Sequence, residues 1–266
     1  MYTKNDLLQY LRDAGLTGRE TILIHSSMKS IGPVEGGADT VLDAWMEFFA
    51  DGLLLLPTHT WANVDRGEVD FDPATSQACI GILPNLFFRR PGVKRSLHPT
   101  HSMAGYGADA ADYLKGEEFT CSPCAPGGCY DRLRARGGKI LLVGVTHARN
   151  TFIHGVEELL AVPRRLTDKP VRTTVLQPDG TRRVVWMRRH HNEQQPLISE
   201  DFIKLDRALE ECGATRVVSF GDARCILCDA QRTFEVIRYI LAPDPECIIT
   251  KPEILPEQWA GFVAEK

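Results

Sequence analysis

The amino-acid sequence predicts a single domain of the α/β class, a layered sheet with helices on its faces. Short apolar runs that suit buried strands alternate with stretches of helical periodicity. Within residues 20–60 the order is strand, loop, helix and strand, which is typical of a layered α/β sheet. The chain has 266 residues, 43% of them apolar, which is enough for one domain with a sizeable core.

The first part of the chain supplies most of the expected strands and helices. Helices are expected at 3–15, 38–50 (ADTVLDAWMEFFA), 82–90 (ILPNLFFRR), 108–116 (ADAADYLKG) and 130–137, and strands at 20–27 (ETILIHSS), 52–60 (GLLLLPTHT) and 139–145. Residues 61–81 show little periodicity, so we expect a long surface excursion there.

The pattern changes after Leu160. VRTTVLQPDGTRRVVWMRRH (171–190) alternates apolar and polar residues on both sides of Pro-Asp-Gly, which predicts a β-hairpin. We therefore expect residues 161–200 to form an added hairpin region within one domain spanning 1–266. A helix at 200–213, a strand pair at 214–230 and a last helix at 231–242 complete the prediction.

The bulk properties argue against two classes of partner. A net charge of −4 gives no reason to expect nucleic-acid binding, because nucleic-acid binders usually show a basic patch or a high pI. No run approaches the roughly 20 apolar residues that span a bilayer, and the amphipathic start does not read as a signal peptide. We expect a cytoplasmic protein that binds neither nucleic acid nor membranes, with a homodimer as the candidate assembly.

Eight cysteines include two CxxC pairs, Cys121/Cys124 and Cys225/Cys228. Without a secretory signal, reduced thiols are favoured over disulfides. Paired CxxC elements can build a zinc site. However, the two pairs lie about a hundred residues apart, and the second lies in a strand-like run, ARCILCDA, where cysteine often fills a core. The first pair, with Cys129 nearby, lies in a Pro- and Gly-rich loop and is the better candidate for a local function.

Five histidines lie where strand-like runs or loops end. They are His25, His59, His98, His101 and His154. In open α/β sheets, ligands bind beyond the carboxyl ends of the strands. A cleft shared by these histidines is therefore expected.

The stretch TFIHGVEELL (151–160) places an imidazole and a carboxylate three residues apart, just past a strand. Thr151 is expected to cap the helix, with His154 in its first turn and Glu157 on the same face. The helix N-terminus favours a neutral ring, and the carboxylate can orient that ring and stabilise a proton that it takes up. The pair is either a general base with its supporting carboxylate or an incidental surface pair.

Three further segments have both a chemical and a structural interpretation. HPTH (98–101) has HxxH spacing, but Pro99 favours a turn over a metal-binding helix face. The Gly-rich loop 25–37 can present backbone N–H groups to a phosphate, although it matches neither nucleotide-binding glycine motif. RRHHN (188–192) is either a solvated basic turn or a specificity element for a negatively charged substrate.

Seven motifs follow one another over nearly the whole chain: HSSMKSIG, GLLLLPTHT, RSLHPTHSMAGYG, a Ser122–Pro123 pair, GGKILLVGV, Thr151-x-x-His154-x-x-Glu157 and FGDARC (220–225). In this order they resemble the aminoglycoside 3-N-acetyltransferase family. This resemblance implies a three-layer α/β/α sandwich with a central mixed sheet. It also implies direct transfer of an acetyl group from acetyl-coenzyme A to an amine in a ternary complex, with no metal. The amine would belong to a small molecule that is aminoglycoside-like or another amino sugar or metabolite.

The resemblance assigns roles to individual residues. His154 would be the general base, Glu157 its supporting carboxylate and Thr151 part of the same catalytic motif. The coenzyme would be bound by Ser26, Ser27, Lys29, Ser30, Ile31, Gly32, Arg95 and Ser96. The amine acceptor would contact His59, His98, Arg189 and His190. Direct transfer needs no cysteine nucleophile.

The expected acceptor region is basic. VPRRLTDKP (162–170) and WMRRHHN (186–192) both carry arginine pairs, and like charges facing a polycation would lower its affinity. We therefore expect an amine that is less basic or anionic, such as an amino sugar or a phosphonate-like metabolite. Two alternatives stay open: a metal-dependent hydrolase using HPTH, RRHHN or the CxxC pairs, and a non-catalytic relative that binds coenzyme A or a metabolite.

Overall fold

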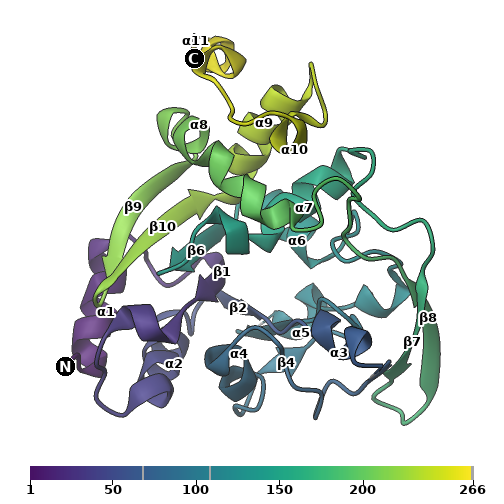
Figure 1. Ribbon diagram of the computed structural model, residues 1–266. Helices are drawn as coiled ribbons and strands as arrows, with labels where there is room; N and C mark the ends of the chain where they lie inside the picture. The colour runs from purple at the N-terminus through teal and green to yellow at the C-terminus, as the bar shows by residue number, and fades with distance from the viewer. Residues whose placement is uncertain (68, 108, 265–266) are drawn as a thin grey trace.

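The computed structural model describes residues 1–67, 69–107 and 109–264. Residues 68 and 108 fall in the expected excursion and the expected 108–116 helix, and 265–266 end the expected domain. These four lie outside the described residues. The α/β class is confirmed: a mixed sheet of seven strands is flanked by helices (Figure 1).

The elements have the following bounds. The strands are β1 (Thr21–Ser26), β2 (Leu53–Pro57), β3 (Asp70–Phe71), β4 (Lys94–Arg95), β5 (Met103–Tyr106), β6 (Lys139–Val143), β7 (Val171–Leu176), β8 (Arg182–Met187), β9 (Thr215–Phe220) and β10 (Ala223–Asp229). The α-helices are α1 (Lys4–Asp13), α2 (Gly37–Phe48), α3 (Trp61–Asp65), α4 (Ile82–Phe87), α5 (Ala110–Tyr113), α6 (Cys129–Ala135), α7 (Thr151–Leu159), α8 (Asp206–Glu211), α9 (Ala230–Leu241), α10 (Cys247–Thr250) and α11 (Ala260–Ala264). Short 3-10 helices are η1 (Met28–Ile31), η2 (Glu117–Phe119), η3 (His147–Arg149), η4 (Ile198–Leu205) and η5 (Pro256–Gln258).

The main sheet has the strand order β4-β5-β2-β1-β6-β10-β9. Its centre, β2-β1-β6, is parallel, whereas β4 and β5 on one side and β10 and β9 on the other pair antiparallel. Parallel strands covered on both faces read as continuous apolar runs. All five residues of β2 (LLLLP) are buried, in agreement with that rule.

Two apolar cores lie on opposite faces of this sheet. Leu23 of β1 belongs to one core, and its neighbours Ile22 and Ile24 belong to the other, because side chains alternate along a strand. Helices α6, α7 and α9 contribute to the first core, and α1, α2 and α4 to the second. The core packing holds the carboxyl ends of β1, β2 and β6 side by side.

The predicted hairpin is confirmed as β7 and β8, and it lies apart from the main sheet (Figure 1). It pairs instead with β3, which forms a second sheet of order β3-β7-β8. The expected excursion at 61–81 therefore contains a short helix, α3, and a strand, β3. Sequence periodicity could not reveal a two-residue strand whose partner lies about a hundred residues away.

The C-terminal third also differs in detail from the prediction. The expected helix at 200–213 is divided into η4 and α8, and the expected last helix, α9, is followed by α10, η5 and α11. Helix α9 begins where Asp229 accepts a hydrogen bond from the backbone N–H of Arg232. Within the described ranges, no helix is long and apolar enough to cross a membrane.

Candidate active site

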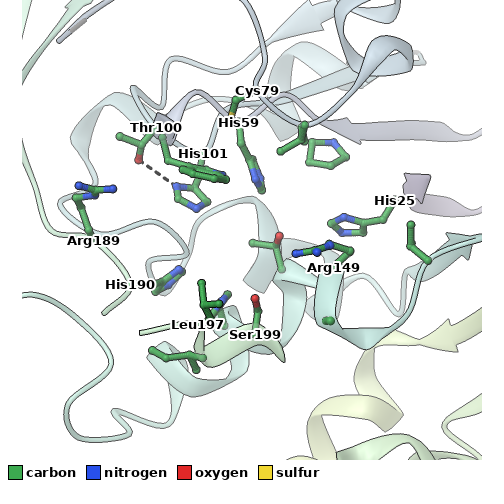
Figure 2. A pocket seen from close by; sticks show the side chains of 18 of the residues that line it. His25, His59, Cys79, Thr100, His101, Arg149, Arg189, His190, Leu197 and Ser199 are labelled. Carbon is green, nitrogen blue, oxygen red and sulfur yellow. Dashed lines mark hydrogen bonds between the residues drawn. The ribbon is translucent and has the colours of Figure 1, made fainter. Parts of the chain in front are cut away.

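A cavity of about 730 Å³ opens beyond the carboxyl ends of β1, β2 and β6. This volume is in the usual range for a small-molecule site. Its titratable lining consists of His25, His59, Cys79, His101, Arg149, His154, Arg189, His190 and His191. Figure 2 shows many of these side chains around the cavity, with His25 from β1 on one side and His190 on the other. The predicted shared cleft is confirmed for four of the five histidines; His98 does not line it.

The predicted pair on α7 is in contact. His154 Nδ1 lies 3.3 Å from Glu157 Oε2, and the other carboxylate oxygen accepts a 2.6 Å hydrogen bond from Arg165 Nε. Glu157 and Arg165 are almost fully buried. When His154 is neutral, Nδ1–H donates to the carboxylate, so Nε2 holds the lone pair that can accept a proton. The three side chains form one ordered array, not a surface pair.

A second histidine–carboxylate pair lies against the first. The His190 ring is stacked on the His154 ring, with centroids 3.9 Å apart and planes 16° apart. His190 Nε2 is 2.7 Å from Glu158 Oε1. The same carboxylate accepts hydrogen bonds from the Ser122 hydroxyl and the Cys124 backbone N–H. Glu158 is therefore fixed by three donors.

Burial favours the neutral form of three site histidines, His59, His101 and His154. It lowers the pKa of His154 to about 4, assisted by the nearby His190 and opposed by Glu157. It also lowers the pKa values of His59 and His101 well below the usual range. For Glu157, burial raises the pKa, but the hydrogen bond from His154 and the charge of Arg165 outweigh it, and the net pKa is lowered. The site thus combines neutral imidazoles with ionised, hidden carboxylates.

Thr151 does not have the capping role that the sequence predicted. Asn150 occupies the N-cap position, and no side chain caps the helix there. Thr151 is instead the first residue of α7 and lines the cavity. The loop before the helix contains a 3-10 turn, η3, which moves the helix start by one residue relative to the sequence pattern.

The residues assigned to the coenzyme lie in two groups. Ser26 lines the cavity, whereas the remaining residues of the group 27–32 are not among the lining residues and form the adjoining loop and η1. Ile31 is fully buried in a core. Gly32 adopts φ +84°, and a Cβ there would lie 2.0 Å from Asp222 Oδ2, so the loop packs closely on the β9–β10 turn. Ser30 donates to the Gly144 carbonyl.

Arg95 and Ser96 have internal partners and are not among the lining residues. The Arg95 guanidinium donates to the carbonyls of Thr58 and Ser76 and lies over the Phe88 ring. The Ser96 hydroxyl accepts from the Met103 backbone N–H. These contacts fix the segment after β4 and leave neither side chain free for the cavity.

The structural interpretation of HPTH is supported for His98. Its Nε2–H donates to the Ser122 carbonyl, and its Nδ1 accepts from the backbone N–H groups of Thr100 and His101. One ring nitrogen is therefore bonded to the cysteine loop and the other to the turn itself. His101 differs, because it lines the cavity and contacts the His59 ring at a centroid distance of 4.5 Å.

The cysteine pairs have different environments. Cys225 and Cys228 are fully buried and belong to the two opposite cores, because residues three apart on a strand face opposite sides. They fill the core, as the sequence suggested. Cys121 is exposed and Cys124 is buried.

Among the described residues, one group of side chains has metal-ligand chemistry: Cys124, Glu158 and His190 offer ligand atoms within 4.8 Å of one another. However, Glu158 and His190 already share a hydrogen bond. Burial also raises the pKa of the Cys124 thiol well above its usual range, which keeps it protonated. These contacts favour a hydrogen-bonded carboxylate over a metal centre.

Three important residues were not predicted as site residues: Glu158, Arg165 and Tyr130. Tyr130 hydrogen-bonds His59 Nε2 at 2.8 Å. Glu158 directly follows Glu157 in the motif, and Arg165 lies in the VPRRL segment, so each had a weak signal in sequence. Their partners come from segments that are distant in the sequence and meet only by packing. The spacing of residues along the chain does not reveal such contacts.

Buried His25 makes stability depend on pH. Its Nε2 has no hydrogen-bond partner, and burial lowers its pKa to about 3, against about 6.5 in an unfolded chain. Because the pKa is lower in the folded state, the stability contributed by neutral His25 is complete above about pH 6.5. It is lost as the pH falls towards 3. We expect His25→Leu to reduce the pH slope of unfolding free energy by about 1.4 kcal/mol per pH unit between about pH 4 and 6. Urea unfolding at several pH values measures this slope, and an unchanged slope would contradict the assignment.

The fold is an α/β sheet with a cavity at its strand ends, and the cavity wall carries an ordered array of histidines and carboxylates. A profile described as aminoglycoside 3-N-acetyltransferase matches residues 23–242. Aminoglycoside N(3)-acetyltransferase IV from Salmonella is 29% identical, with 95% of this chain and 92% of that protein covered. Aminoglycoside N(3)-acetyltransferase VII from Streptomyces paromomycinus is 30% identical, with 86% and 88% covered.

A solved structure is also similar over nearly the whole chain. It is a crystal structure of aminoglycoside acetyltransferase AAC(3)-IVa, a histidine-to-alanine variant in complex with a gentamicin. The TM-score is 0.79 at 30% identity, with 98% of this chain and 93% of that chain covered. The chain belongs to the aminoglycoside 3-N-acetyltransferase family, and it is an acyltransferase.

Proposed function

We propose that this enzyme transfers an acetyl group from acetyl-coenzyme A to the amino group of a small molecule, with His154 as the general base. Family membership supports the reaction class. The observation that carries the mechanism is the array of His154, Glu157 and Arg165 at the wall of the cavity. A neutral imidazole held by a buried carboxylate is the arrangement that accepts a proton in the transition state.

The chemical step balances with the groups present. The amine nitrogen attacks the thioester carbonyl, a C–N bond forms, and Nε2 of His154 takes a proton from the nitrogen. The tetrahedral intermediate then loses the sulfur, and the proton on His154 passes to that sulfur to give the free thiol. Glu157 stabilises the imidazolium that exists between these events.

Direct transfer is favoured over a cysteine acyl-enzyme. Cys79 is the cysteine that lines the cavity, and burial raises its pKa. A thiol with a raised pKa holds little of the thiolate that acts as a nucleophile. The proposal therefore needs both substrates in the cavity at once. The thioester end of the coenzyme would lie beside Ser26, with the 27–32 loop flanking its entry.

The acceptor proposed here carries little positive charge. Among the described residues that line the cavity there is no Asp or Glu, but there are six histidines and two arginines. Glu157 and Glu158 lie behind the imidazoles, each occupied by hydrogen bonds. A polycation would therefore find no carboxylate in the cavity wall. The arginines lie at the rim, where Arg189 pairs with Asp65 and Arg149 with Glu200.

An anionic group on the acceptor would meet these rim arginines. Exposed ion pairs are weak, at about 0–1 kcal/mol, so a phosphate or phosphonate can exchange for the surface carboxylate. We therefore propose an amine that bears an anionic group, in contrast to the aminoglycosides named for the relatives.

A substrate panel tests this acceptor class. We expect higher kcat/KM with 2-aminoethylphosphonate and an amino sugar phosphate than with gentamicin or apramycin. The variant Arg189→Gln should show a smaller preference for the anionic amines over uncharged amino sugars. Loss of thioester absorbance is the measurement, because exposed Cys121 would react with a thiol reagent. Robust turnover of gentamicin, with none of the anionic amines, would overturn the acceptor class.

A further inference from the structure

Two histidine–carboxylate pairs share one cavity, and the mechanism above uses only one of them. His190 comes from the segment after β8 and Glu158 from α7, and they meet at 2.7 Å. The His190 side chain is 11% exposed and lines the cavity beside His154. Among the lining histidines, these two have a buried carboxylate of their own in the described structure.

Acetylation of an alkyl amine involves two protons. At pH 7 an alkyl amine is mostly the ammonium ion, which must lose one proton before its nitrogen can attack. The nitrogen loses a second proton on becoming an amide. One of the two protons ends on the leaving sulfur and the other is released to solvent. His154 accounts for the proton that reaches the sulfur, so the first deprotonation needs its own acceptor.

We infer that His190 is this first proton acceptor: it takes a proton from the bound ammonium, and His154 takes the second during attack. This inference rests on the proposed function. His190 Nε2–H donates to Glu158, which leaves Nδ1 to accept the proton. The carboxylate, held by Ser122 and Cys124, then stabilises the imidazolium.

The stacked geometry makes the two steps alternate. The ring centroids are 3.9 Å apart, so two imidazolium charges would repel each other strongly. This repulsion disfavours the state in which both rings are protonated. His190 must therefore release its proton to solvent before His154 becomes charged. This order matches the order of the chemistry.

The groups around His190 do not replace it as the acceptor. The titratable groups that face it are His154 and Glu158 of α7, His98 and His101 of the turn, His59 after β2, and Cys124 of the cysteine loop. Both ring nitrogens of His98 are occupied, and the side-chain partners of His59 and His101 are the hydroxyls of Tyr130 and Thr100, not a carboxylate that would stabilise an imidazolium. The Cys124 thiol stays protonated because burial raises its pKa.

The test compares His190→Gln with His154→Gln on two acceptors. The acceptors are 2-aminoethylphosphonate, an ammonium at pH 7, and its aminooxy analogue, which is neutral at that pH. For His190→Gln we expect kcat/KM on the alkyl amine to fall on the order of 10²-fold at pH 7 and to approach wild type as pH rises to about 10. Turnover of the aminooxy analogue should fall much less, because this neutral acceptor needs no first deprotonation. His154→Gln should lose turnover of both acceptors.

Two results would overturn the inference. One is an equal loss on both amines with a constant ratio to wild type across pH, which indicates a structural role. The other is an unchanged rate of His190→Gln on the alkyl amine at pH 7. Calorimetric affinity for coenzyme A, unchanged between the variants, confirms that the fold is intact. The wild-type rates on both acceptors test the proposed function separately, because the inference concerns only the ratio of variant to wild type.

Discussion

His154→Gln should lower kcat by about 10²–10⁴-fold while the protein remains folded. The substitution removes the nitrogen that takes a proton during attack, and the amide side chain retains much of the packing against His190 and Phe202. The rate should be followed by loss of the thioester from acetyl-coenzyme A with the best acceptor of the panel. Coenzyme A affinity should change little, because the proposed role lies in the chemical step.

The matched control for this variant is His98→Gln. His98 is a buried histidine of the neighbouring turn, but its ring nitrogens bond to the Ser122 carbonyl and to backbone N–H groups of that turn, and it does not line the cavity. We expect His98→Gln to lower thermal stability and to keep most of the activity of the folded fraction. Wild-type turnover by a folded His154→Gln protein would remove the proposed mechanism.

Glu157→Ala should destabilise the protein by about 3–5 kcal/mol, because it leaves the buried Arg165 charge without its closest partner. The next carboxylate, on Glu246, is 3.8 Å from Arg165 Nη1 and already pairs with Arg164. Urea unfolding at pH 7 measures the change. Activity should fall as well, since His154 loses the carboxylate that orients its ring.

A double variant separates the two effects. Arg165→Met combined with Glu157→Ala removes the unpaired charge, so part of the lost stability should return. The activity lost with Glu157 should not return. If the double variant is no more stable than Glu157→Ala alone, burial of an unpaired guanidinium is not the cause of the instability.

The position of the main candidate base follows from local sequence. His154 and Glu157 are three residues apart on one helix, so any helix at that position brings them together. The strands with continuous apolar runs, such as β2 and β6, were also evident, because strands buried on both faces require such runs. The exact helix start was not evident, because η3 precedes α7 and Asn150 takes the N-cap position.

The coenzyme and acceptor assignments show where sequence reasoning ends. Arg95 and Ser96 belong to a recognisable motif, yet their side chains bond to a neighbouring loop and to the start of β5, and they do not line the cavity. Sequence order places a residue near a strand end but does not determine which way its side chain points. That direction depends on which partners are within reach after the sheet has formed.

The sequence by itself determined the α/β class, the β7–β8 hairpin and the His154–Glu157 pair, because each depends on periodicity or spacing within a short segment. Only the tertiary structure decided that Arg165 supports Glu157, that His190 stacks on His154, and that Glu158 serves the second imidazole. These contacts join α7 to segments before and after the hairpin. Residues far apart in the chain meet through core packing and strand order, which local sequence patterns do not encode.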